Sequence, residues 1–120
     1  MTLYIGIERS TDLQRPDVKI SKFQSRRRAI EWAREGGGFA DPGAARGDLR
    51  PTLQNWHHRH RYVYEMPTGF RLNRAELNRL VKREWQVARG SIYMRDRNQI
   101  EASLYMDAGK EIDVREEARR

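Results

Sequence analysis

The sequence predicts a single small α+β domain, in which an antiparallel sheet of four to five strands has two helices packed on one face. Two observations predict it. Several segments alternate apolar and polar side chains with the period of two that is typical of strands, and residues 73–90 have the start, spacing and end of an amphipathic helix. With 120 residues, the chain is long enough for one two-layer core and not for two.

The expected order of elements is strand, strand, helix, long loop, strand, helix, strand, strand (ββα-loop-βαββ). We expect the domain to occupy residues 1–106 and a charged C-terminal tail to follow over residues 107–120. Within the domain, residues 36–55 are rich in glycine, proline and small residues and have no usable period, which predicts a long mobile loop.

The first part of the chain reads as a hairpin followed by a helix. Residues 3–8 and 17–23 each alternate apolar with polar side chains, and a segment rich in turn formers separates them. A helix is expected over residues 26–35, with Ser25 as its N-cap and the glycines from Gly36 onward as its end.

Residues 56–66 predict a strand whose side chains divide into two chemically distinct faces. One face carries aromatic rings and imidazoles: Trp56, His58, His60, Tyr62 and Tyr64. If this face points outward, with Arg59 and Arg61 at its edge, it resembles the stacking platform with cations that binds single-stranded nucleic acid. If it points inward, the aromatic rings are core beneath a helix, and both readings remain open.

Residues 73–90 predict the most clearly specified helix. Asn73 and Glu76 have the spacing of a capping box, and Gly90 stands where a left-handed residue ends a helix. The apolar residues Leu77, Leu80, Val81, Trp85 and Ala88 recur at steps of three and four, which predicts one buried face. The other face carries Arg74, Arg79, Lys82, Arg83 and Arg89.

Residues 91–106 predict a second hairpin. Ile92 and Met94 alternate with polar neighbours, the polar run 96–99 is expected to turn the chain, and residues 100–106 alternate again. Beyond them, the spacing of Ile112 and Val114 suggests a short edge strand.

The composition is strongly basic and depends on arginine. Lysine and arginine total 24 against 17 acidic residues, for a net charge of +7, and only four of the 24 are lysine. Arginine pairs with phosphate or carboxylate at two points and also stacks on bases, so its dominance favours nucleic acid or an acidic protein surface as partner. A genome rich in GC, which encodes arginine wherever a cation is tolerated, is the alternative explanation.

Three consecutive arginines, Arg26, Arg27 and Arg28, occupy the first turn of the helix expected at residues 26–35. The helix macrodipole disfavours cations there, by roughly 0.3–1 kcal/mol each, so local stability does not explain them. Free N–H groups beside three arginines would form a site for phosphate or carboxylate. The competing interpretation is a solvated surface whose arginine heads remain in water.

Several classes of function lack support in the sequence. There is no cysteine, so we expect neither disulfides nor metal thiolates, and a cytoplasmic location is the default. No apolar run has the length of a membrane span, so no membrane partner is expected. His58 and His60 could share a metal, or a histidine flanked by arginines could act as the base of a metal-free nuclease, but a third ligand and a second acid–base residue are missing. We therefore expect no cofactor, no metal and no catalytic residue.

The sequence leads to a functional hypothesis and one alternative. The hypothesis is a small, basic, non-enzymatic protein that binds DNA, RNA or a nucleic-acid-handling complex through an arginine-rich surface. The alternative is an interaction protein from a phage or mobile element that inhibits a host complex by docking on an acidic or nucleic-acid-binding surface. The residues expected to bind, in either case, are Arg26, Arg27, Arg28, Arg59, Arg61, Arg79, Lys82, Arg83, Tyr62 and Tyr64.

Overall fold

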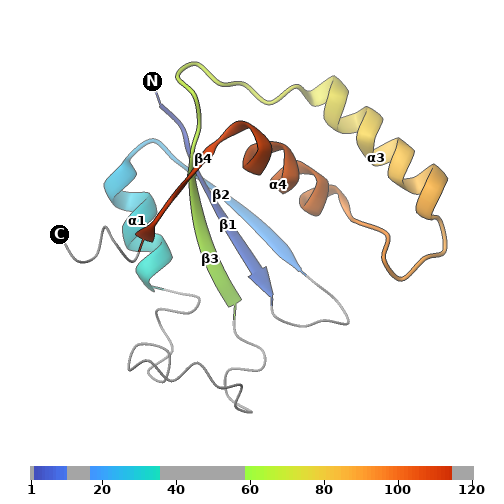
Figure 1. Ribbon diagram of the computed structural model, residues 1–120, viewed down its shortest axis with the longest axis horizontal. Helices are drawn as coiled ribbons and strands as arrows, with labels where there is room; N and C mark the ends of the chain where they lie inside the picture. Colours follow the sequence, from blue (N-terminus) through green and yellow to red (C-terminus); the bar gives the residue numbers. More distant parts are fainter. Residues whose placement is uncertain (1, 11–16, 36–58, 115–120) are drawn as a thin grey trace, which may run out of the picture.

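The computed structural model describes residues 2–10, 17–35 and 59–114, which form a small α+β domain (Figure 1). In chain order, its elements are β1 (Tyr4–Ser10), β2 (Val18–Phe23), α1 (Arg26–Glu35), β3 (Arg59–Glu65), α3 (Arg74–Ala88), α4 (Arg97–Ala108) and β4 (Lys110–Ile112). The expected loop at residues 36–55 and the N-terminal part of the strand expected at 56–66 lie outside the described residues.

Among the described residues, the sheet has four strands in the order β2-β1-β3-β4, and every neighbouring pair is antiparallel. The expected antiparallel sheet is thus confirmed. The register places Ile7 of β1 opposite Ile20 of β2 and Tyr62 of β3. Since strand side chains alternate between faces, this row points to one face of the sheet, and the neighbouring rows point to the other.

One face of the sheet packs against α4. The buried cluster on this face joins Ile5 and Ile7 of β1 to Ala102 and Tyr105 of α4, and Asn98 of α4 donates a hydrogen bond to the Val18 carbonyl oxygen at 3.3 Å. The rings of Phe70 and Tyr105 meet edge to face, with centroids 6.0 Å apart. The segment between β3 and α3 therefore contributes to the same core.

The opposite face packs against α1. Ala29 and Ala33 of this helix are fully buried against Val63 and Ile112 of the sheet. The Trp32 ring covers Gly6 so closely that a Cβ atom at that position would lie 2.5 Å from a ring carbon. The absence of a side chain at position 6 is what lets the indole approach β1 this closely.

The prediction that two helices pack on one face of the sheet is wrong. Ile5 and Gly6 are neighbours on one strand, yet Ile5 belongs to the cluster with α4 and Gly6 lies under Trp32 of α1. The helices α1 and α4 therefore cover opposite faces, and the sheet is the middle of three layers (Figure 1).

The prediction of a hairpin over residues 91–106 is also wrong, because residues 97–108 form α4. Asp96 caps this helix by accepting a hydrogen bond from the Gln99 amide at 2.8 Å, while the Gln99 side chain accepts from the Asp96 amide at 2.8 Å. This capping box specifies a helix start that the alternation of apolar residues concealed. At 3.6 residues per turn, Ala102 and Tyr105 lie on one side of α4 and Ile100 on another, so burial on two sides mimics a strand pattern.

The end of the described chain completes the sheet. The expected short edge strand near Ile112 is present as β4, which pairs with β3 so that Ile112 lies opposite Val63. Residues 107 and 108 of the segment expected as a charged tail are the end of α4, residues 110–112 form β4, and residues 115–120 lie outside the described residues.

Candidate nucleic-acid interface

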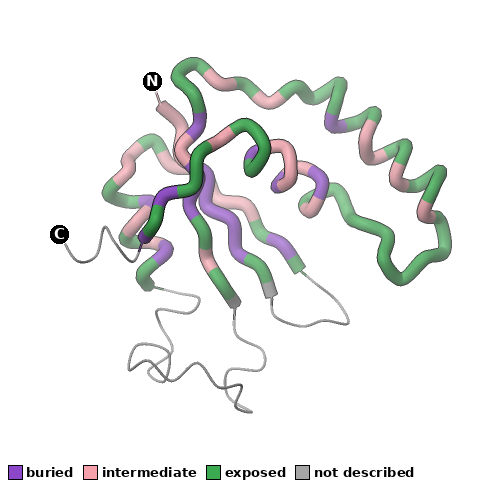
Figure 2. The backbone as a smooth tube through the Cα atoms, in the orientation of Figure 1, coloured by how far each residue is buried: buried purple, intermediate pink, exposed green. Residues whose placement is uncertain are grey.

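Of the helices in the described chain, α3 is the one least covered by the rest of the molecule. Its N-cap and its end are as expected: the Asn73 side chain accepts a hydrogen bond from the Glu76 amide at 3.0 Å, and Gly90 follows the helix with a φ of 81°. Of the expected capping box, this is the half present among the described residues, since the Glu76 carboxylate lies near Arg79 instead. Its principal contacts are with α4, and it extends beyond the sheet (Figure 1). In Figure 2 most of α3 is exposed, whereas burial concentrates in the sheet and the two helices on it.

The apolar face expected on α3 is only partly used for packing. Leu77 is fully buried, and Leu80, Val81 and Ala88 are half-buried. The expectation that Trp85 is buried is wrong, because 53% of this residue is exposed. A single helix, α4, is too narrow to cover the whole apolar stripe of α3.

The outer side of α3 carries three of the predicted binding residues, Arg79, Lys82 and Arg83, which we call the α3 basic face. Their spacing of three and four residues places them on one side of the helix, and all three are exposed. Arg79 lies 3.9 Å from the Glu76 carboxylate, a long and exposed contact. Within the described residues, Lys82 and Arg83 form no ion pair.

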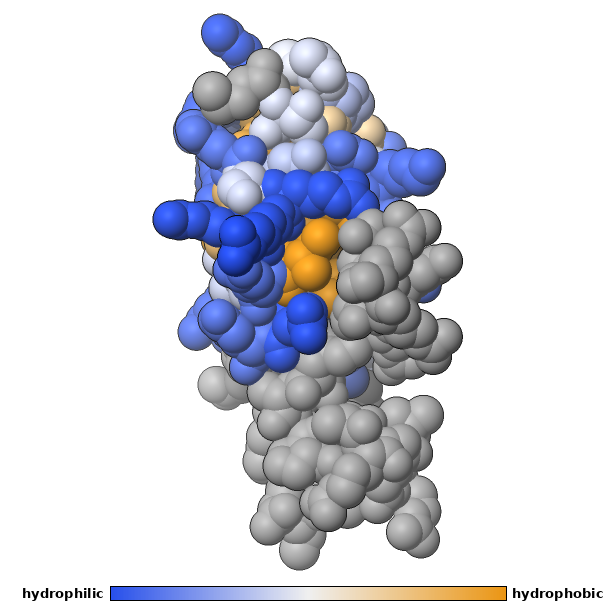
Figure 3. Space-filling model, turned by 90° about the vertical axis from the view of Figure 1, so that its left-hand side faces the viewer, coloured by the Kyte–Doolittle hydropathy of each residue, from blue (hydrophilic) through white to orange (hydrophobic). Residues whose placement is uncertain are grey.

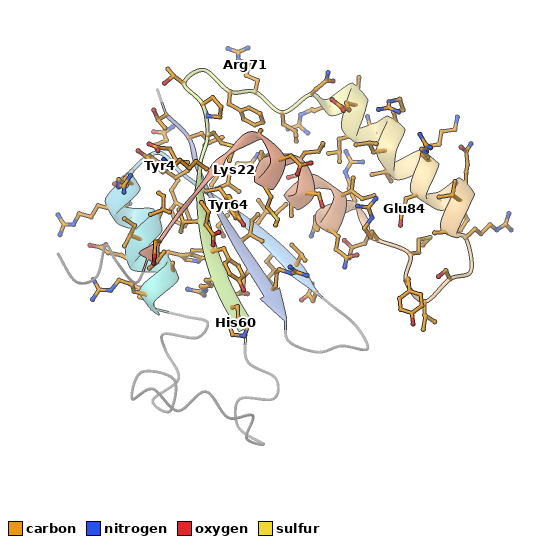
Figure 4. All side chains as sticks on the ribbon, viewed as in Figure 1. Tyr4, Lys22, His60, Tyr64, Arg71 and Glu84 are labelled. Carbon is orange, nitrogen blue, oxygen red and sulfur yellow. The ribbon has the colours of Figure 1, made fainter. Side chains whose placement is uncertain are left out.

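The end of α3 is fastened to the start of α4 by a pair of side chains. Glu84 accepts hydrogen bonds from the Arg95 amide at 2.9 Å and from the Arg95 guanidinium at 3.1 Å. These hydrogen bonds hold the pKa of the Glu84 carboxyl below its ordinary value. Figure 4 shows Glu84 projecting from α3 toward the segment that leads into α4.

A second polar contact joins α3 to α4, between side chains farther from the turn than Glu84 and Arg95. The Arg97 guanidinium donates to the Asn78 side-chain oxygen at 2.9 Å. We call α3, α4 and the turn that joins them the helical hairpin. Its two polar contacts fix how α3 projects, and they leave the α3 basic face uninvolved.

The three arginines of α1 lie apart from α3, at another end of the molecule (Figure 1). Arg27 forms an ion pair with Glu31 at 3.0 Å, and the Arg28 amide donates to Ser25 Oγ at 3.3 Å, which is the N-cap expected from the sequence. The Ser25 cap uses one of the N–H groups that an anion site at this terminus would need. Seen from the α1 side, the described surface is mostly hydrophilic and includes a small hydrophobic area (Figure 3).

The strand β3 has the two faces that the sequence predicts, and they meet different environments. Tyr64 is 9% exposed, Tyr62 is 36% exposed and His60 is exposed, so this face is covered near α4 and open toward the other end of the strand (Figure 4). Burial and the nearby Glu111 carboxylate raise the pKa of the Tyr64 hydroxyl above 10.0. Tyr64 thus belongs to the core and is not placed as a stacking surface.

Arg61, on the other face of β3, is occupied by contacts within the protein. Its guanidinium lies 2.8 Å from the buried Glu8 carboxylate, donates to the Trp32 carbonyl oxygen at 2.6 Å, and stacks 4.5 Å from the Trp32 ring centre. Arg61 therefore stabilises the junction of α1 with the sheet. Arg59 is in β3, but its side chain lies outside the described residues.

The predicted binding residues therefore separate into groups. Arg79, Lys82 and Arg83 lie together on α3, and the arginines of α1 are remote from them. Arg61 forms an ion pair with Glu8, and Tyr64 is buried in the core. The sequence reading missed the exposed end of the helical hairpin, where Trp85 and Tyr93 protrude. The run of apolar residues around Tyr93, just after Gly90, could have indicated this exposed end. The sequence analysis instead assigned these residues to a strand of the predicted β-hairpin.

Two further features of the described residues concern metal ligands and membrane spans. His57 and His58 lie outside the described residues, and the described part of the chain contains no group of three or more His, Cys, Asp or Glu side chains placed to hold a metal ion. No helix among the described residues combines the length and the apolar character needed to cross a membrane.

Comparison of the chain with protein-family models, with curated protein sequences and with solved structures found no match in any of the three.

Proposed function

We propose that this protein binds nucleic acid, without catalysing a reaction on it, through the α3 basic face. The observation that carries the proposal is a projecting helix whose outer side presents Arg79, Lys82 and Arg83 to solvent. Cations at this spacing suit a phosphate backbone, since each can displace a counterion from it.

The geometry of the helical hairpin supports this use of α3. Among the described residues, α3 packs mainly against α4, and its opposite side is exposed. A helix of 15 residues is about 22 Å long, enough to lie along several phosphates of one strand. The contacts Glu84–Arg95 and Arg97–Asn78 hold the helix in one orientation, which reduces the ordering that binding requires.

The proposal is tested by fluorescence polarisation with short single- and double-stranded DNA and RNA at about 50 and about 200 mM salt. We expect the affinity of the wild-type protein to fall steeply with salt. The triple variant R79A/K82A/R83A should bind more weakly, and the slope of log K against log salt should become shallower by about 3, because each lost phosphate contact removes about one unit.

The matched control is the triple variant R26A/R27A/R28A, which removes the same charge from α1. We expect its salt slope to stay within about one unit of that of the wild-type protein. If the α1 variant loses binding and the α3 variant does not, the interface is at the N-terminus of α1 and not on α3. If the wild-type protein binds none of the oligonucleotides, the proposed function is wrong.

A further inference from the structure

The end of the helical hairpin exposes an unusual number of apolar side chains. We define the hairpin tip as Trp85, Arg89, Ile92, Tyr93 and Met94. Ile92 is 87% exposed, Tyr93 is 84% exposed, Trp85 is 53% exposed and Met94 is 36% exposed. Exposed apolar side chains gathered in one short stretch mark an interaction surface more often than isolated ones do.

The backbone of the hairpin tip is held by its own hydrogen bonds. The Ser91 amide donates to the Ala88 carbonyl oxygen at 2.9 Å, and the Met94 amide donates to the Ser91 carbonyl oxygen at 3.2 Å. The Tyr93 amide donates to Ser91 Oγ at 3.0 Å, and Arg95 is fastened to Glu84. Ile92 and Tyr93 therefore project from an ordered turn, which lowers the entropy lost when they insert into a partner.

The charges around the hairpin tip indicate the chemistry of that partner. The Arg89 guanidinium stacks 5.5 Å from the Trp85 ring centre, and Lys82 lies about one turn before Trp85 on α3. The acids of this stretch are Glu84 and Asp96, and both are engaged, Glu84 by Arg95 and Asp96 by the Gln99 amide. The surroundings of the apolar side chains are therefore cationic, which favours an anionic partner and disfavours a second copy of this basic chain.

An anionic partner that also offers flat apolar surface is nucleic acid with exposed bases. Aromatic rings next to cations form the arrangement on which unpaired bases stack, and isoleucine and methionine are among the side chains that wedge between base steps. We infer that the hairpin tip inserts Tyr93, Ile92 and Trp85 among unpaired or unstacked bases while the α3 basic face contacts the adjacent phosphates. This inference rests on the proposed function and adds to it the class of nucleic acid that is preferred, single-stranded or locally opened.

The inference is tested by comparing a fully paired DNA duplex with the same duplex containing a short single-stranded gap, with the fluorescent base 2-aminopurine placed in the gap. We expect the wild-type protein to bind the gapped duplex roughly tenfold or more tightly and to change the 2-aminopurine fluorescence. The variant I92A/Y93A should lose this preference and the fluorescence change, and its salt slope should stay unchanged because the phosphate contacts remain.

Two control variants and a sedimentation measurement separate base contact from other effects. V87A truncates an apolar residue that is 72% exposed on another side of α3, and it should retain the preference. Y93F retains the ring and should also retain it. Sedimentation of the wild-type protein and I92A/Y93A should show the same size for both.

The possible outcomes distinguish this inference from the proposed function. Salt-dependent binding with equal affinity for paired and gapped duplex would overturn the inference and leave the proposed function standing. Loss of a dimer in I92A/Y93A would assign the hairpin tip to contact between copies and would also overturn the inference. Absence of any salt-dependent binding would overturn both.

Discussion

Arg61 and Arg27 show how the same side chain has two different roles in this protein. Each forms an ion pair with a glutamate, at 2.8 Å for Arg61 with Glu8 and at 3.0 Å for Arg27 with Glu31. The Arg61 and Glu8 side chains are 21% and 10% exposed, whereas those of Arg27 and Glu31 are 87% and 49% exposed. Water screens the second pair far more than the first, so only the first should matter for stability.

We expect R61A to lower the free energy of unfolding by about 3 kcal/mol, because Glu8 is left as a buried carboxylate without this cation. R27A is the matched control and should cost less than about 1 kcal/mol. Urea denaturation of both variants at neutral pH measures the difference. Equal losses for the two variants would mean that burial does not distinguish the pairs.

Single residues also show what the sequence can and cannot predict about the site. The alternation along residues 60–65 correctly separates the faces of β3, because the period of two is set by the backbone. It does not reveal that Tyr64 is covered and Tyr62 partly open, since that depends on where α4 lies. In the same way, the position of Arg61 next to Glu8 arises from pairing between strands more than fifty residues apart in the chain, which no local pattern records.

A helix of this protein could be predicted from the sequence where its capping residues and its apolar spacing indicate the same structure. The helices α1 and α3 were predicted because their caps and periods agree, with Ser25 and Asn73 both serving as N-caps. The helix α4 was missed because its period and its cap disagree: the apolar spacing suggests a strand, and the Asp96–Gln99 capping box specifies a helix. Packing on two sides produced that spacing, so the cap was the more reliable local signal.

The helical hairpin should respond to acid through Glu84. Because its pKa is lowered in the folded protein, its stabilising contribution is complete above the ordinary carboxyl pKa of 4.5 and is lost as the pH falls through the lower folded value. We expect the Arg95 amide to exchange with solvent faster, relative to other amides, near pH 3 than near pH 6. Amide hydrogen exchange followed by NMR measures this protection.

The variants E84Q and E76Q test whether that response depends on this carboxyl group. In E84Q, protection of the Arg95 amide should be weaker at neutral pH and should lose most of its acid dependence. E76Q is the control on the same helix, because the ion pair of Glu76 within the described residues is a long, exposed contact of 3.9 Å with Arg79. An acid response that persists in E84Q would assign it to another group.

At the scale of the whole molecule, the three-layer arrangement buries two tyrosines beneath or within α4. Tyr105 is 1% exposed, and the charges of Lys22 and Glu101 act on its hydroxyl in opposite directions. Burial raises the pKa of both Tyr64 and Tyr105 above the ordinary value of 10.0. The neutral hydroxyl is therefore favoured in the folded state, and this preference couples the stability of the whole domain to alkaline pH.

We expect the free energy of unfolding to be insensitive to these tyrosines below about pH 10 and to fall as the pH rises further, because the unfolded chain releases their protons first. In Y105F the fall should be less steep, because one of the two buried hydroxyl groups that titrate is removed. Y93F, which alters a tyrosine that is 84% exposed, should follow the wild-type curve. Urea denaturation across this pH range measures the slopes, and identical slopes for all three proteins would refute the coupling.

The central position of β1 has a consequence for biosynthesis. During synthesis, Ile20, which pairs with Ile7 on one side of β1, follows it closely in the chain. Tyr62, which pairs with Ile7 on the other side, is made only after a further forty or so residues. Ile112 of β4, which pairs with Val63 of β3, is made later still. Until β3 is synthesised, one edge of β1 presents unpaired N–H and carbonyl groups beside an apolar surface. During translation there is therefore an interval in which one edge of β1 is open to pairing with another chain, although in the finished sheet β2 and β3 cover both of its edges.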